Sequence, residues 1–199
     1  MPNDIAVIPP TAVYRLMWNP PLSPVVVAGI VRMINSTVPE GGTLGYAQPL
    51  DQHTAAGFIE SLDCRIQGGD THMLMGMAGS EPAFFVLMTQ SGMPNCRHRA
   101  ELSKGVVYPS HRGRGLLRLA LAEIVARAHD LGVEQFELDV RENSRAHRLW
   151  QQMGFSTWGV VEDYARVNGR VHRGHYMRQS VVELAERLRL QLEGEGVSC

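Results

Sequence analysis

Hydrophobic residues recur at helical spacing in two parts of this chain. The clearer stripe alternates spacings of four and three residues and is followed by Gly132, a residue type that commonly ends helices. It consists of Leu117, Leu121, Ile124, Ala128 and Leu131. A second stripe, near the C-terminus, consists of Val181, Leu184, Leu188 and Leu192. Two amphipathic helices are therefore predicted, and the second should bury its leucines against the domain or against a second subunit.

Capping residues predict where three further helices begin. Ser23, with a proline directly after it, is a typical helix start and precedes the apolar run 25–34. Asp51 is placed to cap a helix that runs to about Ile66. The segment 144–153 begins with a serine and is followed by a glycine, which predicts another short helix.

Seven short segments combine strand-forming residues with flanking turn signals. The last two flank Asn168-Gly169, a dipeptide typical of tight hairpins. The predicted strands are 13–18, 71–78, 83–90, 99–108, 134–140, 156–161 and 171–177. The segment 37–49, rich in glycine and proline, is predicted to be a long loop, and loops of that length are usually functional or mobile.

The order of these elements predicts an α+β fold, with one mixed central sheet and helices on both of its faces. Residues 1–12 carry three prolines and no periodicity, so they are expected to form a loose arm. Residues 13–180 are expected to form one domain, and residues 181–199 a C-terminal amphipathic helix and tail.

Composition narrows the function classes. A chain of 199 residues with 44% apolar and 20% charged residues has the size and composition of one globular domain. A net charge near −1 argues against a nucleic-acid or membrane-surface partner. The three cysteines form no CxxC pair, and neither a signal peptide nor an apolar run of about 18 residues is recognisable. A cytoplasmic protein is therefore expected.

The most informative stretch runs from Val106 to Leu117, where a predicted strand leads through a glycine-rich turn directly into the clearest helix. The first N–H groups of a helix and the positive end of its dipole favour an anion. Arginines in the turn add positive charge, and glycines let the backbone approach an anion closely. The segment is Arg112-Gly113-Arg114-Gly115-Leu116-Leu117. It matches neither a Walker motif nor a dinucleotide GxGxxG pattern, and a plain strand–helix turn is the alternative interpretation.

Here the sequence resembles the GNAT N-acetyltransferases. Arg112-x-x-Gly115 after a valine-rich strand is similar to their acetyl-CoA signature. The later segment from Asn143 through Leu149-Trp150 to Gly154-Phe155 is similar to the GNAT helix that ends in Gly-Phe. The resemblance covers residues 13–178 and implies acetyl-CoA as co-substrate. It also implies cofactor contacts from the 112–117 segment and Asn143, and a backbone N–H near Val107 that meets the oxyanion.

Two positions depart from the GNAT pattern. Leu117 stands where the signature usually has glycine or alanine, which leaves the backbone N–H groups available. Trp150 stands where many members have the tyrosine that protonates the leaving thiolate, and indole offers no usable acid. Tyr164 is expected to take that role, with Tyr108 or water as alternatives.

A narrower likeness is to tabtoxin-resistance-type acetyltransferases, which acylate the amine of a β-lactam amino-acid toxin. Residues 37–46, Ala100-Glu101-Leu102, Leu138-Asp139 and the stretch from Tyr164 to His172 carry it. It implies a small amine acceptor that is amino-acid-like or toxin-like. Glu40 and Tyr46 are the expected substrate contacts, and the alternative is that they are ordinary loop surface. Both lie in the long segment 37–49, which is called the glycine-rich loop below.

Acetyl transfer to an amine needs a group that accepts the ammonium proton. Glu101, on the strand before the turn, and Asp139, on the neighbouring strand, are the candidate bases, alone or as a coupled pair. The alternatives are that Glu101 is a solvated strand residue and that Asp139 pairs with Arg141. The histidines show no ligand spacing, so no metal is expected. A non-catalytic acyl-CoA-binding module and an acyltransferase for longer acyl groups remain the alternative functions, and a homodimer is left open.

Overall fold

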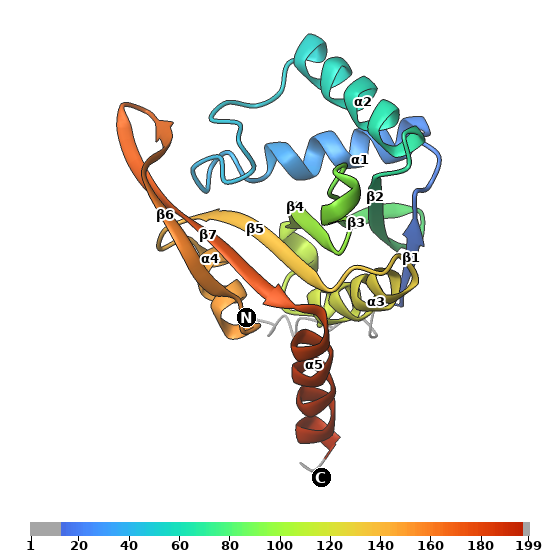
Figure 1. Cartoon of the computed structure of the whole chain (residues 1–199). Coiled ribbons are helices and arrows are strands. Elements are labelled where there is room, and N and C mark those ends of the chain that lie inside the picture. Colours follow the sequence, from blue (N-terminus) through green and yellow to red (C-terminus); the bar gives the residue numbers. More distant parts are fainter. Residues whose placement is uncertain (1–12, 197–199) are drawn as a thin grey trace, which may run out of the picture.

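A seven-stranded mixed sheet forms the centre of the computed structural model, which describes residues 13–196 (Figure 1). Its strands are β1 (Tyr14–Trp18), β2 (Thr71–Ala78), β3 (Glu81–Gln90), β4 (Arg99–Val107), β5 (Gln135–Arg141), β6 (Ser156–Val167) and β7 (Arg170–Ser180). Their order in the sheet is β1-β2-β3-β4-β5-β7-β6. Every neighbouring pair is antiparallel except β4 and β5, which are parallel. The α+β class and the mixed sheet are as predicted.

Five α-helices accompany the sheet within the described residues. They are α1 (Pro24–Asn35), α2 (Gln52–Gln67), α3 (Leu116–Asp130), α4 (Arg145–Gln152) and α5 (Val181–Gly196). Two single 3-10 turns, η1 (Pro94–Cys96) and η2 (Pro109–His111), flank β4. The predicted caps are confirmed, because the side chains of Ser23, Asp51 and Ser144 accept hydrogen bonds from the first turns of α1, α2 and α4.

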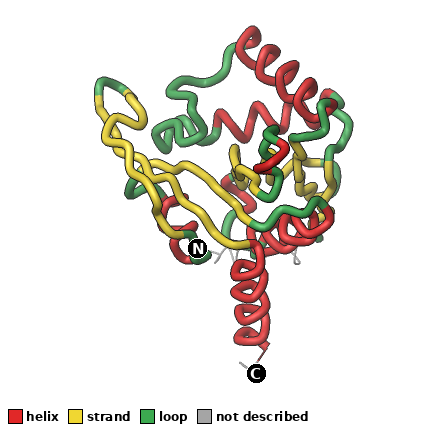
Figure 2. The backbone as a smooth tube through the Cα atoms, in the orientation of Figure 1, coloured by secondary structure: helices red, strands yellow, loops and turns green. Residues whose placement is uncertain are grey.

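The two faces of the sheet bury separate cores. Alternate residues of the central strands point to opposite sides, so Met73 of β2 and Phe85 of β3 pack with α1, whereas Leu74 and Phe84 pack with α3. Figures 1 and 2 show α1 and α2 on one side of the sheet and α3 and α5 on the other. The expected placement of helices on both faces is confirmed.

The C-terminal stripe packs against the same domain. Val181, Leu184 and Leu188 are buried and belong to the core that contains α3. The fourth member, Leu192, and the expected arm 1–12 lie outside the residues or side chains that the structure describes.

The last hairpin is longer than its hydrophobic pattern predicted. β6 and β7 stay paired out to Val167 and Arg170, and Asn168 and Gly169 both have positive φ, as a tight hairpin turn requires. The distal half of the hairpin is largely exposed, so its sequence lacks the alternation that marks a half-buried strand.

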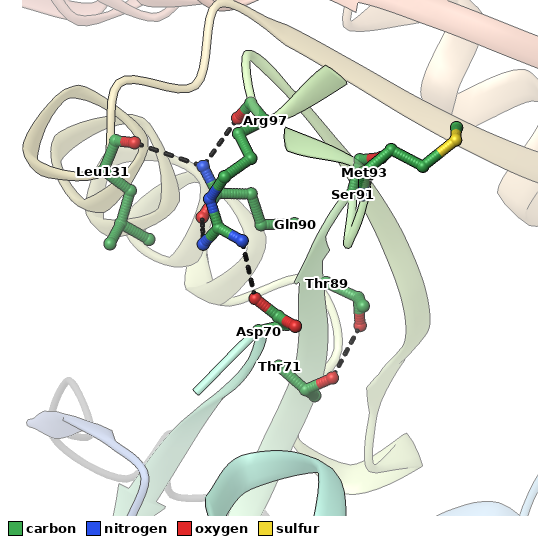
Figure 3. Close-up of polar contacts among 8 residues, drawn as sticks. All are labelled: Asp70, Thr71, Thr89, Gln90, Ser91, Met93, Arg97 and Leu131. Carbon is green, nitrogen blue, oxygen red and sulfur yellow. Dashed lines mark hydrogen bonds and ion pairs between the residues drawn. The ribbon is translucent and has the colours of Figure 1, made fainter. Parts of the chain in front are cut away.

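A polar network secures the sheet where β3 leads into β4. The buried amide of Gln90 donates to the carbonyl oxygens of Arg97 (2.6 Å) and Leu131 (3.2 Å), which ties this connection to the end of α3. Arg97 in turn donates to Gln90 at 2.7 Å and to Asp70 at 2.9 Å (Figure 3). This network fixes the start of β4. None of the helices that the structure describes is long and apolar enough to span a membrane.

Candidate active site

The parallel strands β4 and β5 separate after a short pairing. Three residue pairs, ending at Glu101 and Glu137, form the only ladder between these two strands. Beyond that point β4 also carries a bulge, since Lys104 and Gly105 together stand opposite Val86 of β3. Lys104 has a φ of 56°, an uncommon backbone conformation for a lysine. The sheet therefore opens between two strands that each carry a candidate base.

The predicted phosphate loop leads from β4 to α3. The 3-10 turn η2 follows β4, and Gly113 and Gly115 then take φ values of 74° and 71°. A residue with a Cβ rarely adopts this conformation, so both glycines are needed for the backbone path. Gly115 is the N-cap of α3, and the first N–H groups of a helix lack intrahelical acceptors. The loop can therefore present N–H groups to an anion.

A cavity of about 790 Å³ lies along the opening between β4 and β5 and reaches this loop. Among the residues that line it are most of those expected to bind the cofactor. These are Val107, Arg112, Gly113, Gly115, Leu116, Leu117 and Asn143. Arg114 is exposed and does not line the cavity. The residues that sequence reasoning assigned to the cofactor are thus brought together, with this one exception.

Three basic side chains hold the glycine-rich loop over the cavity. Arg112 forms an ion pair with the carboxylate of Glu40. Arg141, at the end of β5, donates to the carbonyl oxygen of Gly41 at 2.9 Å. Lys104 donates to the carbonyl oxygen of Leu44 at 2.9 Å. Glu40 and Leu44 themselves line the cavity, so the loop forms one of its walls.

An acidic and basic cluster lies beside this wall, on the α1 and α2 side of the sheet. Partial burial raises the pKa of the Glu101 carboxyl, and the nearby charge of Asp139 raises it further. Burial lowers the pKa of the Lys104 ammonium, whereas Asp139 and Glu101 act in the opposite direction. Glu101 and Asp139 both remain exposed to solvent. The two candidate bases are therefore electrostatically coupled and can be reached from solvent, but neither of them is among the residues that line the cavity.

Tyr164 donates its hydroxyl hydrogen bond to the carboxylate of Asp139. Burial raises the pKa of the phenol well above its usual value, and the contact with Asp139 raises it further. A phenol that holds its proton more tightly is a poorer acid for a thiolate. Tyr164 does not line the cavity, and Tyr108 lies beneath the guanidinium of Arg32 at 4.8 Å.

Other expected contacts have local partners. The ring of Tyr46 lies 5.7 Å from the Lys104 ammonium and packs edge-on against Phe58, outside the cavity lining. The alternative in which Asp139 pairs with Arg141 is not observed, because Arg141 holds the glycine-rich loop and Asp139 accepts a hydrogen bond from Tyr164.

Trp150, which stands at the position of the usual tyrosine, lines the cavity and packs against Phe155, with ring centroids 4.9 Å apart.

Sequence reasoning missed the contribution of Lys104 and the role of Arg141. Lys104 is the only lysine of the chain. Its position, two residues before the valine-rich end of the strand at Val106, was the one feature of the sequence that could have indicated a role near the site. The bulge that turns it toward the glycine-rich loop has no such signal. Among the side chains that the structure describes, no group of three or more metal-ligating residues is close enough to hold a metal ion.

Comparison with known proteins matches the chain to one family and one fold. The model of the acetyltransferase (GNAT) family matches residues 45–155. A crystallised candidate phosphinothricin N-acetyltransferase is similar, with 16% identity, a TM-score of 0.72, and coverage of 85% of this chain and 99% of that chain. A ribosomal-protein-alanine N-acetyltransferase from Brucella melitensis has 18% identity and a TM-score of 0.68, with coverage of 84% and 99%.

A candidate acetyltransferase from Salmonella typhimurium, solved with its cofactor acetyl-CoA, is similar to the same extent. Its identity is 17%, its TM-score is 0.68, and the match covers 85% of this chain and 94% of that chain. Likenesses at this level of identity concern the fold, whereas the family model spans more than half of the sequence.

Proposed function

The chain belongs to the GNAT acetyltransferase family, and we propose that it moves the acetyl group of acetyl-CoA onto the amine of a small acceptor by direct attack in a ternary complex. We propose that the acceptor is a small amine that resembles an amino acid, a toxin or an antibiotic. One observation supports this most strongly. The strand β4 carries Glu101 and leads to the glycine-containing turn at one end of the cavity, and Asp139 on the neighbouring strand β5 is electrostatically coupled to Glu101.

The residues at the cavity suit acetyl-CoA. Gly113 and Gly115 would present backbone N–H groups to the pyrophosphate, and Arg112 would add a charge-assisted contact. An added Cβ would meet open space at either glycine, so a ligand can approach the turn closely. Asn143 and Val107 line the remaining length. The bound thioester supplies the activated acetyl group.

Glu101 is proposed as the base. A carboxyl with a raised pKa is a stronger proton acceptor than an ordinary glutamate, and it lies on the strand beside the bulge. It would take the ammonium proton directly or through one water, and Asp139 would share the task. A backbone N–H near Val107 would stabilise the oxyanion as charge develops there.

We propose a different role for Tyr164 than protonation of the thiolate. Its hydroxyl is directed to Asp139, and its raised pKa opposes proton loss. Tyr164 would instead orient Asp139. Trp150 has no acidic proton to offer, so the leaving thiolate would take its proton from water.

The charges near Glu101 favour an acceptor that carries both signs. The carboxylates of Glu101 and Asp139 suit an ammonium group, and Lys104 can meet an acidic group of the same molecule. Glu40 and Tyr46, on the loop that Lys104 holds, stay our proposed acceptor contacts. Such an acceptor and acetyl-CoA are both cytoplasmic metabolite types, and we propose that compartment for the reaction.

Free-thiol release from acetyl-CoA tests the proposal. Amino acids, dipeptides and polyamines are offered one by one, and the rate is compared with hydrolysis in their absence. Acceleration by one class of small amine supports the proposal. The same amines are also offered together with longer acyl-CoA donors, and thiol release with those donors only would favour the alternative acyl donor. Tight acetyl-CoA binding without release for any amine would favour the binding module, which the loss of the usual tyrosine at Trp150 would permit.

A further inference from the structure

Tyr164 reaches Asp139 by crossing a strand. Tyr164 lies on β6, Asp139 lies on β5, and β7 runs between them. A side chain on β7 at the crossing point would block the phenol ring. The residue at that point is Gly174, which pairs with Arg141 of β5 on one side and with Val161 of β6 on the other.

The space above Gly174 is filled by the tyrosine ring. A Cβ placed on Gly174 would lie 2.1 Å from Cγ of Tyr164 and 2.3 Å from its Cδ2. Distances below 3.0 Å require a shift of one partner. The φ of Gly174 is not positive, so its backbone would accept other residues. Gly174 is therefore required because it leaves room for the ring of Tyr164, and not because the backbone there has an unusual conformation.

A bulge in β6 directs Tyr164 toward this gap. Between the pairs Val161–Gly174 and Ala165–His172, three residues of β6 stand opposite Arg173 alone. Arg173 holds the bulge, since it contacts Glu162 at 2.8 Å and Glu142, just after β5, at 2.9 Å. Bulge and gap together place the phenol on the side of the sheet where Glu101 and Asp139 lie.

We propose that Gly174 is a positioning residue of the acceptor site, because its missing side chain lets Tyr164 lie across β7 and orient the Asp139 carboxylate. The inference rests on the proposed function in one respect, namely that Asp139 takes part in acetyl transfer. Gly174 is not among the residues that line the cavity, so the proposed role acts through Tyr164 and Asp139.

A double-mutant cycle tests the role. Gly174→Ala and Tyr164→Ala should each lower kcat/KM for the amine by about the same factor, roughly 10- to 100-fold, the usual effect of losing a hydrogen bond to a charged group. The KM for acetyl-CoA should not change. In the Tyr164→Ala background, Gly174→Ala should have no further effect, because the ring that it displaces is absent. Losses that multiply, or a Gly174→Ala variant with parental kinetics, would overturn the inference.

Gly159 offers a matched control on the same hairpin. A Cβ there would lie 3.8 Å from the Cβ of Tyr176, an ordinary contact, so Gly159→Ala should keep parental kinetics. If Gly174→Ala fails to fold, the double variant with Tyr164→Ala should regain the fold, and its comparison with Tyr164→Ala alone still decides the question.

A second readout does not depend on activity. The phenol of Tyr164 has a raised pKa, so it should stay protonated when ordinary tyrosines ionise near pH 10. Absorbance at alkaline pH should show one more ionising tyrosine in Gly174→Ala than in the parent, with circular dichroism confirming the fold. An unchanged tyrosine titration in Gly174→Ala would contradict the proposed placement of Tyr164 across β7, even if activity falls. An inactive parent enzyme with the expected titration shift would reject the proposed function and retain the positioning contact.

Discussion

The carboxylate of Glu40 and the guanidinium of Arg112 form an ion pair that joins the glycine-rich loop to the turn before α3. Arg112 is the side chain expected to meet a phosphate of acetyl-CoA. In the proposed complex, the carboxylate of Glu40 and a phosphate of acetyl-CoA would therefore compete for the guanidinium of Arg112. Arg141 and Lys104 hold the same loop through carbonyl oxygens, which do not compete in this way.

Removing the charge of Glu40 should tighten cofactor binding. Glu40→Gln leaves Arg112 free of its carboxylate partner, and a partly exposed ion pair contributes up to about 1 kcal/mol. The dissociation constant for acetyl-CoA, measured by calorimetry, should fall about two- to fivefold. Glu81→Gln is the control, since Glu81 pairs with Arg32 away from the cavity. Weaker binding in Glu40→Gln would show that this carboxylate supports the cofactor site.

A negative charge in the phosphate turn should weaken cofactor binding. Gly115→Glu places a carboxylate where the pyrophosphate is expected, and a cost of roughly 2 kcal/mol or more follows from charge repulsion and lost N–H contacts. Acetyl-CoA should raise the melting temperature of the parent strongly and that of the variant weakly. Gly79→Glu is a matched control, because Gly79 also has positive φ and open space around it but lies in another turn. Equal stabilisation of the parent by pantetheine alone would contradict the assignment.

Local signals in the sequence predicted much of the fold and part of the site. The caps Ser23 and Asp51 and the hairpin turn at Asn168 depend on nearby residues only, and each was recognisable. The turn before α3 was recognisable for the same reason. The contacts of Lys104 and Tyr164 were not, because they depend on bulges and on partners far away in the chain.

Glu101 should destabilise the folded protein at neutral pH. Its folded-state pKa is raised, so folding disfavours the ionised form that is present above its ordinary value of 4.5. Glu101→Gln removes this cost and should raise the melting temperature at pH 7. The difference from the parent should shrink as the pH falls through the raised folded-state pKa and vanish below about 4.5, where both states carry a protonated carboxyl. A lower melting temperature for Glu101→Gln at pH 7 would contradict the sign of the shift.

The helix α5 should contribute to the stability of the domain. Leu184 is fully buried against the core that contains α3, so Leu184→Ala should cost roughly 2–5 kcal/mol of unfolding free energy. Urea denaturation measures the loss. Val182, one face away and 68% exposed, is the control, and Val182→Ala should change the unfolding free energy by less than about 0.5 kcal/mol. Equal effects of the two substitutions would show that α5 is not docked in solution.

Glu101→Gln should separate catalysis from cofactor binding. The amide keeps the shape of the side chain but accepts no proton at neutral pH, and the loss of a positioned base typically lowers rates by about 10²- to 10⁴-fold. kcat/KM for the amine should fall by about that factor near pH 7, while acetyl-CoA affinity stays unchanged. The loss should shrink at high pH, where the free amine needs no base. Activity within about threefold of the parent, together with an inactive Asp139→Asn, would move the base to β5.

The pH dependence of the parent enzyme tests the same assignment by its sign. Because the pKa of Glu101 is raised, the acid limb of kcat/KM should lie above pH 4.5. Lys104→Met removes a positive charge that lowers this pKa, so the limb should move to higher pH. Asp139→Asn removes a negative charge that raises it, so any remaining activity should show the limb at lower pH. Shifts in the same direction for both variants would mean that the limb reports another group, and the base would have to be sought outside this cluster.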